Sequence, residues 1–241
     1  GGIWIPWYSF EILHQGKKGK GSVIMERLIC VLVGYVFGLI QTGYLYGKKN
    51  GVDLRKKGSG NAGTTNALRT MGWKAGGVTL LGDCFKCVVA VVVVHMIYGK
   101  THTDMMPLLS MYAGMGVVLG HNYPFYLKFK GGKGIAATAG LIISTTNIWI
   151  VLICLAAFIA IVATTRYVSL GSMTVVTIYL ISVIVYGQHG GFHVENVAYL
   201  HEMYGIATFL MILAFWRHRA NIKRLLSGTE NKISVGGKDK K

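Results

Sequence analysis

Long apolar stretches separated by basic loops set the strongest constraint on how this chain can fold. Shorter stretches cover about residues 28–47, 75–98, 106–120, 168–186 and 199–216, and a longer one covers residues 134–165. A helix needs about 20 mostly apolar residues to cross a bilayer, and most of these stretches come close to that length. The pattern therefore predicts an all-α membrane protein.

The composition excludes most other classes of protein. Hydrophobic residues make up 52% of the chain, while Asp, Glu, Lys and Arg together make up only 14%. An ordinary soluble domain carries about 25% charged residues, so a soluble surface of this composition would lack solvating groups. The formal net charge of +16 would suit a nucleic-acid binder, but that function leaves the apolar stretches unexplained. We expect no nucleic-acid partner.

Basic residues predict the topology. Lys and Arg collect in three loops, at about residues 48–74, 128–133 and 217–224, and such loops usually face the cytoplasm. The stretch 134–165 is too long for one crossing at 1.5 Å per residue, so we expect a turn near its polar cluster, Thr145, Thr146 and Asn147. The result is a seven-transmembrane-helix bundle with the N-terminus outside and the C-terminus in the cytoplasm.

The two ends of the chain are expected to lie outside this bundle. Residues 1–24 would place a lysine cluster on the outer side, and Met25 resembles an initiator. We therefore interpret residues 1–24 as a leader or a non-native extension. Residues 228–241 have the composition of a polar, basic tail, which leaves residues 25–227 as a single membrane domain.

The first basic loop contains a glycine-rich motif, GSGNAGTTNALR at residues 58–69. Glycine permits a positive φ and a close approach of the backbone, and a nest of amides and hydroxyls can hold a phosphate group. A flexible Gly/Ser linker is the alternative interpretation. The candidate phosphate-binding residues are Ser59, Gly60, Asn61, Gly63, Thr65, Asn66 and Arg69.

The other two basic loops each carry a candidate anion site. In the second, Lys133 stands between Gly132 and Gly134 where the next helix is expected to begin, and a helix N-terminus with a lysine favours anions. In the third, His218 and Asn221 share a helix face and are followed by Lys223 and Arg224. Ordinary basic loops at a membrane border are the alternative for both.

Some ionisable and thiol groups lie inside the apolar stretches. Asp83 and Lys86 are spaced i, i+3, and charges in such a place are usually functional or paired. We interpret them as an ion pair, with ligand contact as the alternative. The four cysteines are also in apolar stretches and do not form a metal-binding pattern. We expect no metal and no other cofactor.

Together, the three loops resemble the bacterial integral-membrane glycerol-3-phosphate acyltransferases that use acyl phosphate as donor, the PlsY type. The matching stretches are GSGNAGTTNALR (58–69), GHNYPFYLKFKGGKGIA (120–136) and HRANIKRLL (218–226). RYVSLGS (166–172) and LGDCFK (81–86) are also similar to the family. The resemblance covers about residues 26–233.

The resemblance implies an activity. It implies transfer of a fatty acyl group from acyl phosphate to the sn-1 hydroxyl of glycerol 3-phosphate. The products would be 1-acylglycerol 3-phosphate (lysophosphatidate) and inorganic phosphate, in the first step of phospholipid synthesis. The protein would lie in the bacterial plasma membrane, in contact with membrane lipid, with its active site at the cytoplasmic face. A membrane transporter of a phosphorylated metabolite is the alternative, and the sequence does not indicate an oligomeric state.

The resemblance also implies roles for individual residues. The catalytic residues would be Ser59, Lys133, His218 and Asn221. Ser59 and its loop would hold the acyl-phosphate head, Lys133 would neutralise the phosphate, and His218 with Asn221 would orient the glycerol hydroxyl. Either His218 or the donor's own phosphate would accept the proton. Phosphate contacts would come from Gly60, Asn61, Gly63, Thr65, Asn66, Arg69, Gly132, Gly134, Lys223 and Arg224.

Overall fold

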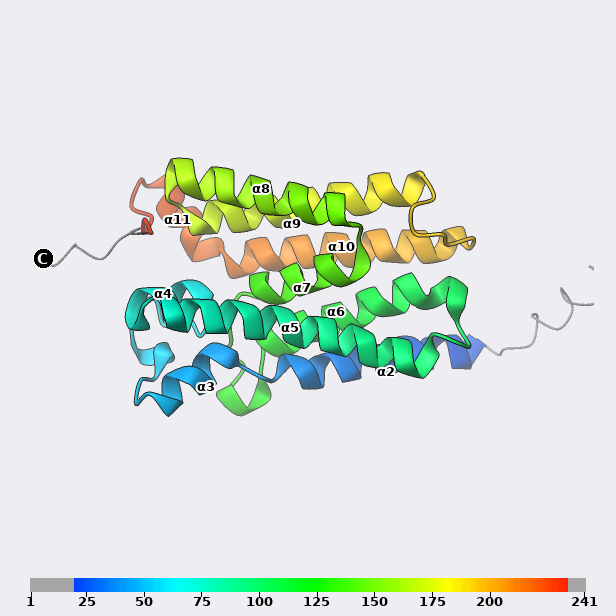
Figure 1. Cartoon of the computed structure of the whole chain (residues 1–241), viewed down its shortest axis with the longest axis horizontal. Helices are drawn as coiled ribbons and strands as arrows, with labels where there is room; N and C mark the ends of the chain where they lie inside the picture. The colour runs from blue at the N-terminus through cyan, green and yellow to red at the C-terminus, as the bar shows by residue number, and fades with distance from the viewer. Residues whose placement is uncertain (1–19, 234–241) are drawn as a thin grey trace, which may run out of the picture.

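The computed structural model describes residues 20–233, and this part of the chain folds into helices without a β-strand (Figure 1). Most of residues 1–24, which we interpret as a leader, lie outside the described residues. So does part of the predicted tail at residues 228–241. The first described helix, α2, already begins at Lys20.

The helices follow one another with short connections. Within the described range the α-helices are α2 (Lys20–Gly38), α3 (Thr42–Lys49), α4 (Thr64–Met71), α5 (Trp73–Tyr98), α6 (Met106–Asn122), α7 (Ile135–Thr145), α8 (Ile148–Thr165), α9 (Val168–Gln188), α10 (Val197–Arg217) and α11 (Arg219–Leu226). Short 3-10 helices lie at Leu54–Lys56, Thr103–Met105 and Phe125–Leu127.

Five segments of the described chain are long and apolar enough to cross a membrane. They are Ile24–Lys49, Trp73–Tyr98, Ile148–Thr165, Val168–Gln188 and Val197–Arg217. Helix α6 has 17 residues and α7 has 11, so both are shorter than the usual spanning length of about 20 residues. The seven crossings and the orientation of the termini stay predictions.

The predicted turn inside residues 134–165 is present. Helix α7 ends at Thr145 and α8 begins at Ile148. The Asn147 side chain caps α8 by accepting a hydrogen bond from the Ile150 backbone N–H at 3.0 Å. The polar cluster therefore ends one helix and starts the next, as its side-chain chemistry suggests.

The first apolar stretch contains a break between α2 and α3 that its composition does not indicate. The buried Gln41 side chain donates to the backbone oxygens of Gly38 at 3.1 Å and His121 at 3.0 Å. The Lys86 ammonium donates to the Ile40 oxygen at 2.6 Å. These side-chain partners satisfy carbonyl groups that the break would otherwise leave unpaired inside the bundle.

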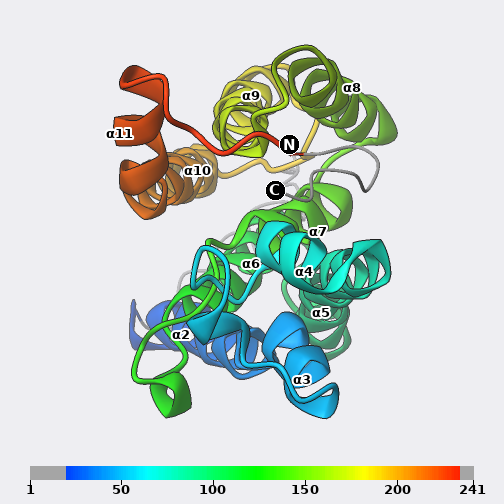
Figure 2. The same ribbon diagram turned by 90° about the vertical axis from the view of Figure 1, so that its left-hand side faces the viewer.

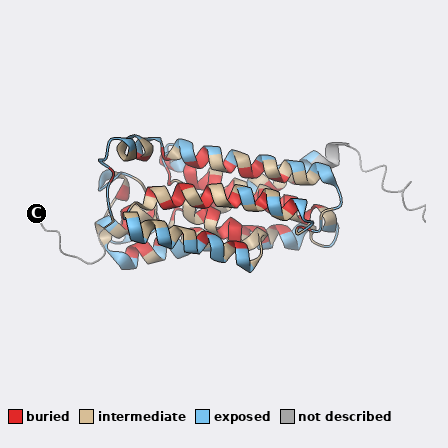
Figure 3. Ribbon diagram, turned by 90° about the horizontal axis from the view of Figure 1, so that it is seen from above, coloured by how far each residue is buried: buried red, intermediate tan, exposed pale blue. Residues whose placement is uncertain are grey.

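The bundle consists of two packed units, which Figure 2 shows in end view. Helices α2 to α7 form the first unit, in which α6 packs against α2 and α7 packs against α5. Helices α8 to α11 form the second, with α9 packed between α8 and α10. Contact of α10 with α6, and of α7 with α8 and α9, joins them. Buried residues follow the inner faces of the long helices (Figure 3).

Outward faces of the long helices are apolar. Leu32, Phe85, Trp149 and Ile159 are examples of large exposed hydrophobic side chains. A helix that is hydrophobic on all sides is suited to a membrane, because its outer face then meets lipid. The three basic loops lie together at the end of the bundle that carries α3, α4 and α11 (Figure 1).

Candidate active site

Three of the helices that begin at the end of the bundle carrying α3, α4 and α11 start within the sequence motifs and have no side-chain cap. They are α4, α7 and α11, whose N-cap residues are Gly63, Gly134 and His218. The first backbone N–H groups of a helix lack intrahelical partners, and the helix dipole adds positive potential there. Each sequence motif thus supplies a helix N-terminus that favours an anion, and Figure 2 views them from this end.

Asn66 holds the first motif together. Its side chain is 2% exposed and accepts from the Ser59 N–H at 2.9 Å. Its amide nitrogen is within hydrogen-bond distance of the Leu54, Lys57 and Asn61 oxygens. Because all its polar atoms serve the loop, Asn66 has a structural role here, and its direct contact with a substrate stays a prediction.

The loop needs glycine at its start. Gly58 has a φ of +58°, and a Cβ there would lie 2.2 Å from the Asn66 side-chain oxygen. The N–H groups of Gly60 and Gly63 donate to Lys57 O at 3.0 Å and Asn61 Oδ1 at 2.9 Å. The loop is therefore rigid, and several of its N–H groups are already used within it.

The remaining candidates of the first motif lie around this rigid loop. Ser59 and Arg69 have exposed side chains, and Thr65 is half-buried in the first turn of α4. Within residues 20–233 the hydroxyl of Ser59 and the guanidinium of Arg69 have no hydrogen-bond partner, so both are available at the surface. Their predicted contacts with phosphate stay predictions.

The turn before Lys133 is fixed from both sides. The N–H groups of Gly131 and Gly132 donate to Asn122 O at 3.2 Å and His121 O at 3.1 Å. The Arg217 guanidinium donates to the carbonyl oxygens of both glycines, at 3.1 and 2.8 Å. Arg217 was expected only as part of a basic cluster, yet it holds the turn that presents Lys133.

Lys133 and Asn221 meet from different units of the bundle. The Lys133 ammonium donates to the Asn221 side-chain oxygen. Asn221 Nδ2 donates to Glu230 Oε1 at 2.7 Å, and Ser169 Oγ donates to the same oxygen at 3.1 Å. Arg224 Nε donates to Glu230 Oε2 at 2.8 Å. A continuous polar chain therefore connects the second and third motifs.

Glu230 is a candidate site residue that the sequence motifs missed. It is 9% exposed and lies in the segment interpreted as the tail. The available signal was that Glu230 is the only acidic residue between Glu202 and Asp239, within a basic segment. An isolated carboxylate among cations is a candidate for pairing with them.

His218 is buried next to this chain. Its Nδ1 donates to the Ala214 backbone oxygen at 2.7 Å, which leaves Nε2 as a hydrogen-bond acceptor in the neutral ring. Burial, and then the charge of Lys133, lower the pKa of His218 to about 4. At neutral pH the imidazole is therefore uncharged.

Arginines from the first and third basic loops lie around Lys133 of the second. Burial lowers the pKa of Lys133 to about 8, and the charges of Arg224, Arg217 and Arg69 act in the same direction, while Glu230 opposes them. Lys133 is still mostly charged at neutral pH. The structure thus brings together Lys133, Arg69, His218, Asn221 and Arg224. The side chain of Lys223 is exposed and has no hydrogen bond within residues 20–233.

Metal-ligating side chains do not cluster in the described part of the chain: no three of its His, Cys, Asp and Glu residues form a group that could hold an ion. The absence of a cofactor stays a prediction.

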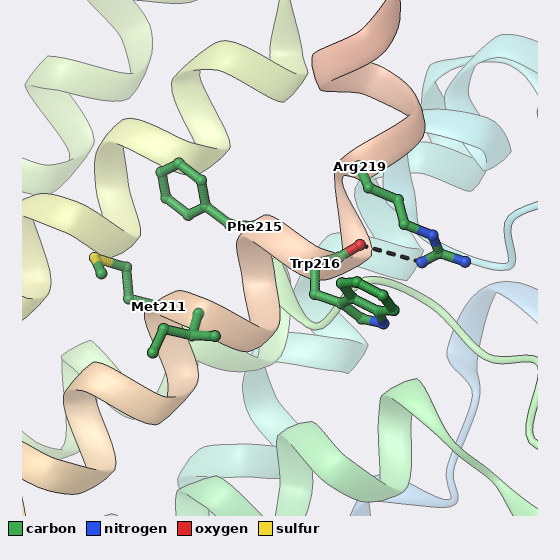
Figure 4. Close-up of a pocket in the computed structure, with 5 residues that line it drawn as sticks. Met211, Phe215, Trp216 and Arg219 are labelled. Carbon is green, nitrogen blue, oxygen red and sulfur yellow. Dashed lines mark hydrogen bonds between the residues drawn. The ribbon is translucent and has the colours of Figure 1, made fainter.

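An apolar groove of about 450 Å³ lies on the outer face of α10, lined by Met211, Ile212, Phe215, Trp216 and Arg219 (Figure 4). The Arg219 guanidinium donates to the Trp216 backbone oxygen at 3.1 Å and lies over the indole ring. None of these residues belongs to the polar cluster around Lys133. The groove is therefore a separate apolar surface beside the candidate site.

Comparisons with known proteins agree on one family. A family model described as "Glycerol-3-phosphate acyltransferase" matches residues 28–228. A glycerol-3-phosphate acyltransferase of Clostridioides difficile is 43% identical over 211 residues, which are 87% of this chain and 97% of the relative. One from Halalkalibacterium halodurans is 41% identical, covering 85% of this chain and 94% of the relative.

Two solved structures of PlsY (YgiH), an integral membrane glycerol 3-phosphate acyltransferase, are also similar. The glycerol 3-phosphate form has a TM-score of 0.74 and 31% identity, covering 86% of this chain and 96% of that one. The lysophosphatidic acid form has a TM-score of 0.72 and 30% identity, covering 86% of this chain and 95% of that one.

Proposed function

Because the chain belongs to the glycerol-3-phosphate acyltransferase family, we propose that it moves a fatty acyl group from acyl phosphate to the sn-1 hydroxyl of glycerol 3-phosphate. The products are 1-acylglycerol 3-phosphate and inorganic phosphate. The protein acts as a multi-pass protein of the bacterial membrane, with its active site at the cytoplasmic face. The gathering of the basic loops at one end of the bundle supports this orientation.

The meeting of the three motifs around Lys133 is the observation that carries this proposal. Lys133, Arg69, Arg217 and Arg224 contribute positive charge, and Glu230 is the carboxylate among them. Two phosphate groups, one on each substrate, require such an excess of cations together with uncapped helix N-termini. Ser59, Gly60, Asn61, Gly63, Thr65, Gly132, Gly134 and Lys223 complete the proposed phosphate contacts.

The reaction needs no covalent intermediate with the protein. The sn-1 hydroxyl oxygen attacks the acyl carbonyl carbon, and the bond from this carbon to the phosphate oxygen breaks. Phosphate leaves with the bonding electron pair. Holding the two substrates in the correct geometry contributes up to roughly 7–11 kcal/mol in favourable cases. Lys133, charged at neutral pH, stabilises the negative charge on the departing phosphate.

The hydroxyl proton goes to the leaving phosphate in this proposal. The pKa of His218 is about 4, whereas a phosphate oxygen titrates near a pKa of about 6. The phosphate is therefore the stronger proton acceptor. His218 Nε2 accepts a hydrogen bond from the sn-1 hydroxyl and orients it, and Asn221 keeps Lys133 in place.

The transporter alternative has less support. Binding sites of secondary transporters lie near the bilayer midplane, whereas the cluster around Lys133 belongs to loops at one end of the bundle. We therefore retain the enzymatic function.

A phosphate-release assay tests the function. Purified protein with palmitoyl phosphate is expected to release phosphate only when glycerol 3-phosphate is present, with an equal amount of lysophosphatidate formed. Palmitoyl-coenzyme A in place of palmitoyl phosphate is expected to give no product. Activity with the coenzyme A ester alone would overturn the donor assignment, and phosphate release without acceptor would indicate a hydrolase.

The pH dependence of kcat/KM is expected to follow the protonation state of Lys133. Above a pH of about 8 the ammonium loses its proton, so kcat/KM falls about tenfold for each further pH unit. Values of kcat/KM measured between pH 6 and 10 define this decline, the basic limb of the pH profile. The variant Lys133→Arg keeps its charge at these pH values, so its profile is expected to lack the limb. A limb that persists near pH 8 in this variant would assign it to another group.

A further inference from the structure

Helix α5 carries a buried ion pair at the level of the α2–α3 break. Asp83 and Lys86 are 1% and 4% exposed, and Lys86 Nζ lies 2.9 Å from Asp83 Oδ1. The same carboxylate oxygen accepts from Thr42 Oγ1 at 3.0 Å. The predicted mutual pairing of Asp83 and Lys86 is thus confirmed. Their further contacts indicate that pairing is only part of their role.

Lys86 uses its whole ammonium group. Besides Asp83, it donates to the Ile40 oxygen at 2.6 Å and to His121 Nδ1 at 2.9 Å. An ammonium has three N–H donors, so these three short contacts use all of them, and the Gly38 oxygen at 3.4 Å is a fourth, longer neighbour. Because Lys86 donates to Nδ1, the neutral His121 ring carries its proton on Nε2.

The Nε2 edge of His121 supports the Gly131–Gly132 turn. A Cβ added at Gly132 would lie 1.9 Å from His121 Nε2. The ring therefore packs directly against the Gly132 backbone, while the His121 oxygen accepts from the Gly132 N–H. Lys133 is the next residue along the chain, so the position of this ring helps to set the position of the Lys133 ammonium.

We propose that Asp83, Lys86 and His121 form a positioning network that holds the Gly131–Gly132 turn and thereby places Lys133 for acyl transfer. The inference rests on the function proposed above. Asp83 and Lys86 act through His121, and His121 acts through the turn, so none of them needs to touch a substrate. Arg217 completes the clamp from the other unit by holding the two glycine carbonyls.

A second, half-buried ion pair in the same bundle provides a control. Arg27 and Glu202 form a bidentate pair with both distances at 2.7 Å, and it joins α2 to α10. Tyr112 adds a further hydrogen bond to Glu202. This pair packs helices together but has no contact with the Lys133 turn, so its loss is expected to lower stability with little effect on chemistry.

The experiment compares full-length Lys86→Met, the double variant Asp83→Leu/Lys86→Met and Glu202→Gln with the wild type. The readouts are the melting temperature, kcat and KM with palmitoyl phosphate and glycerol 3-phosphate, and the pH profile. We expect Lys86→Met to lower kcat by at least about tenfold, since a misplacement of about 1 Å can cost about 100-fold in rate. Glu202→Gln is expected to stay within about twofold of the wild-type kcat while its melting temperature falls.

The double variant separates positioning from ion pairing. Replacing both charges with apolar side chains removes the uncompensated buried charge, so stability is expected to recover. His121 still lacks its donor, so kcat is expected to stay low. Recovery of both stability and kcat would show that the pair only neutralises charge, and the proposal would be abandoned. If Lys86→Met does not fold, the double variant alone tests the proposal.

The pH profile adds an independent readout. Lys86 is not among the groups that shift the pKa of Lys133, which are Glu230, Arg224, Arg217 and Arg69 besides burial. A changed pKa of Lys133 in Lys86→Met therefore reports movement of the turn. We expect the basic limb to move above pH 8 in Lys86→Met and to stay in place in Glu202→Gln. An unmoved limb in both variants would contradict the inference.

Failure of the proposed function remains distinguishable from failure of this inference. A wild-type protein without acyltransferase activity would refute the function alone. The pH dependence of Lys133 modification by an amine reagent, followed by mass spectrometry, would then still report the position of the turn. We expect the apparent pKa of this modification to rise in Lys86→Met and to stay unchanged in Glu202→Gln.

Discussion

Replacing Lys133 with methionine is expected to lower kcat/KM by at least about 100-fold, as the loss of one transition-state contact does in other enzymes. The Lys133 ammonium lies where charges from all three motifs meet, and it donates to Asn221. Methionine keeps a long apolar side chain but lacks the positive charge that we propose stabilises the departing phosphate. The measurement is phosphate release at varied glycerol 3-phosphate concentration.

The same loop supplies the control for this variant. Lys130 has an exposed side chain and no hydrogen bond to another side chain within residues 20–233. Lys130→Met removes an equal charge from the loop, so it is expected to retain activity within about twofold, as surface charges contribute little. Equal losses in the two variants would mean that overall loop charge, and not the position of Lys133, controls the reaction.

Replacing Glu230 with alanine is expected to have the second large effect. Asn221 Nδ2, Ser169 Oγ and Arg224 Nε would each lose their acceptor. Leaving a buried donor unsatisfied costs about 1–3 kcal/mol, so both the melting temperature and the activity are expected to fall. We expect kcat/KM to drop by at least about 100-fold, because Asn221 would no longer hold Lys133 in position.

A carboxylate at the opposite end of the bundle provides the comparison. The exposed Glu195 lies in the loop between α9 and α10, and its side chain has no hydrogen bond in the described part of the chain. Glu195→Ala is expected to keep the wild-type melting temperature and activity, since surface substitutions usually change stability by less than about 0.5 kcal/mol. Wild-type activity in Glu230→Ala would show that the polar chain from Lys133 to Glu230 is dispensable.

Local patterns of the sequence predicted most of the helical framework. Apolar length located five segments long enough to cross a membrane. The polar residues Thr145 to Asn147 located the turn between α7 and α8, because such residues end and cap helices. The break between α2 and α3 was not predicted. It depends on Gln41 and Lys86 reaching carbonyl groups from other positions in the bundle, and such tertiary contacts leave no periodic signal.

The candidate site could be predicted in part. The resemblance of the motifs led to Lys133, His218 and Asn221, which the structure brings together. The same motif could not separate ligand contacts from scaffold, since Asn66 uses its polar atoms on its own loop. Glu230 was missed because its role depends on packing between α9, α11 and the segment after it.

The division of the site between two units has a consequence for when the protein becomes active. Lys133 and Arg69 belong to segments that are synthesised first, whereas His218, Asn221 and Glu230 belong to segments that are synthesised late. Synthesis proceeds from the N-terminus, so a nascent chain that ends after α7 contains Lys133 and Arg69 but lacks His218, Asn221 and Glu230. We therefore expect acyltransferase activity to begin only when translation has delivered α11 and Glu230.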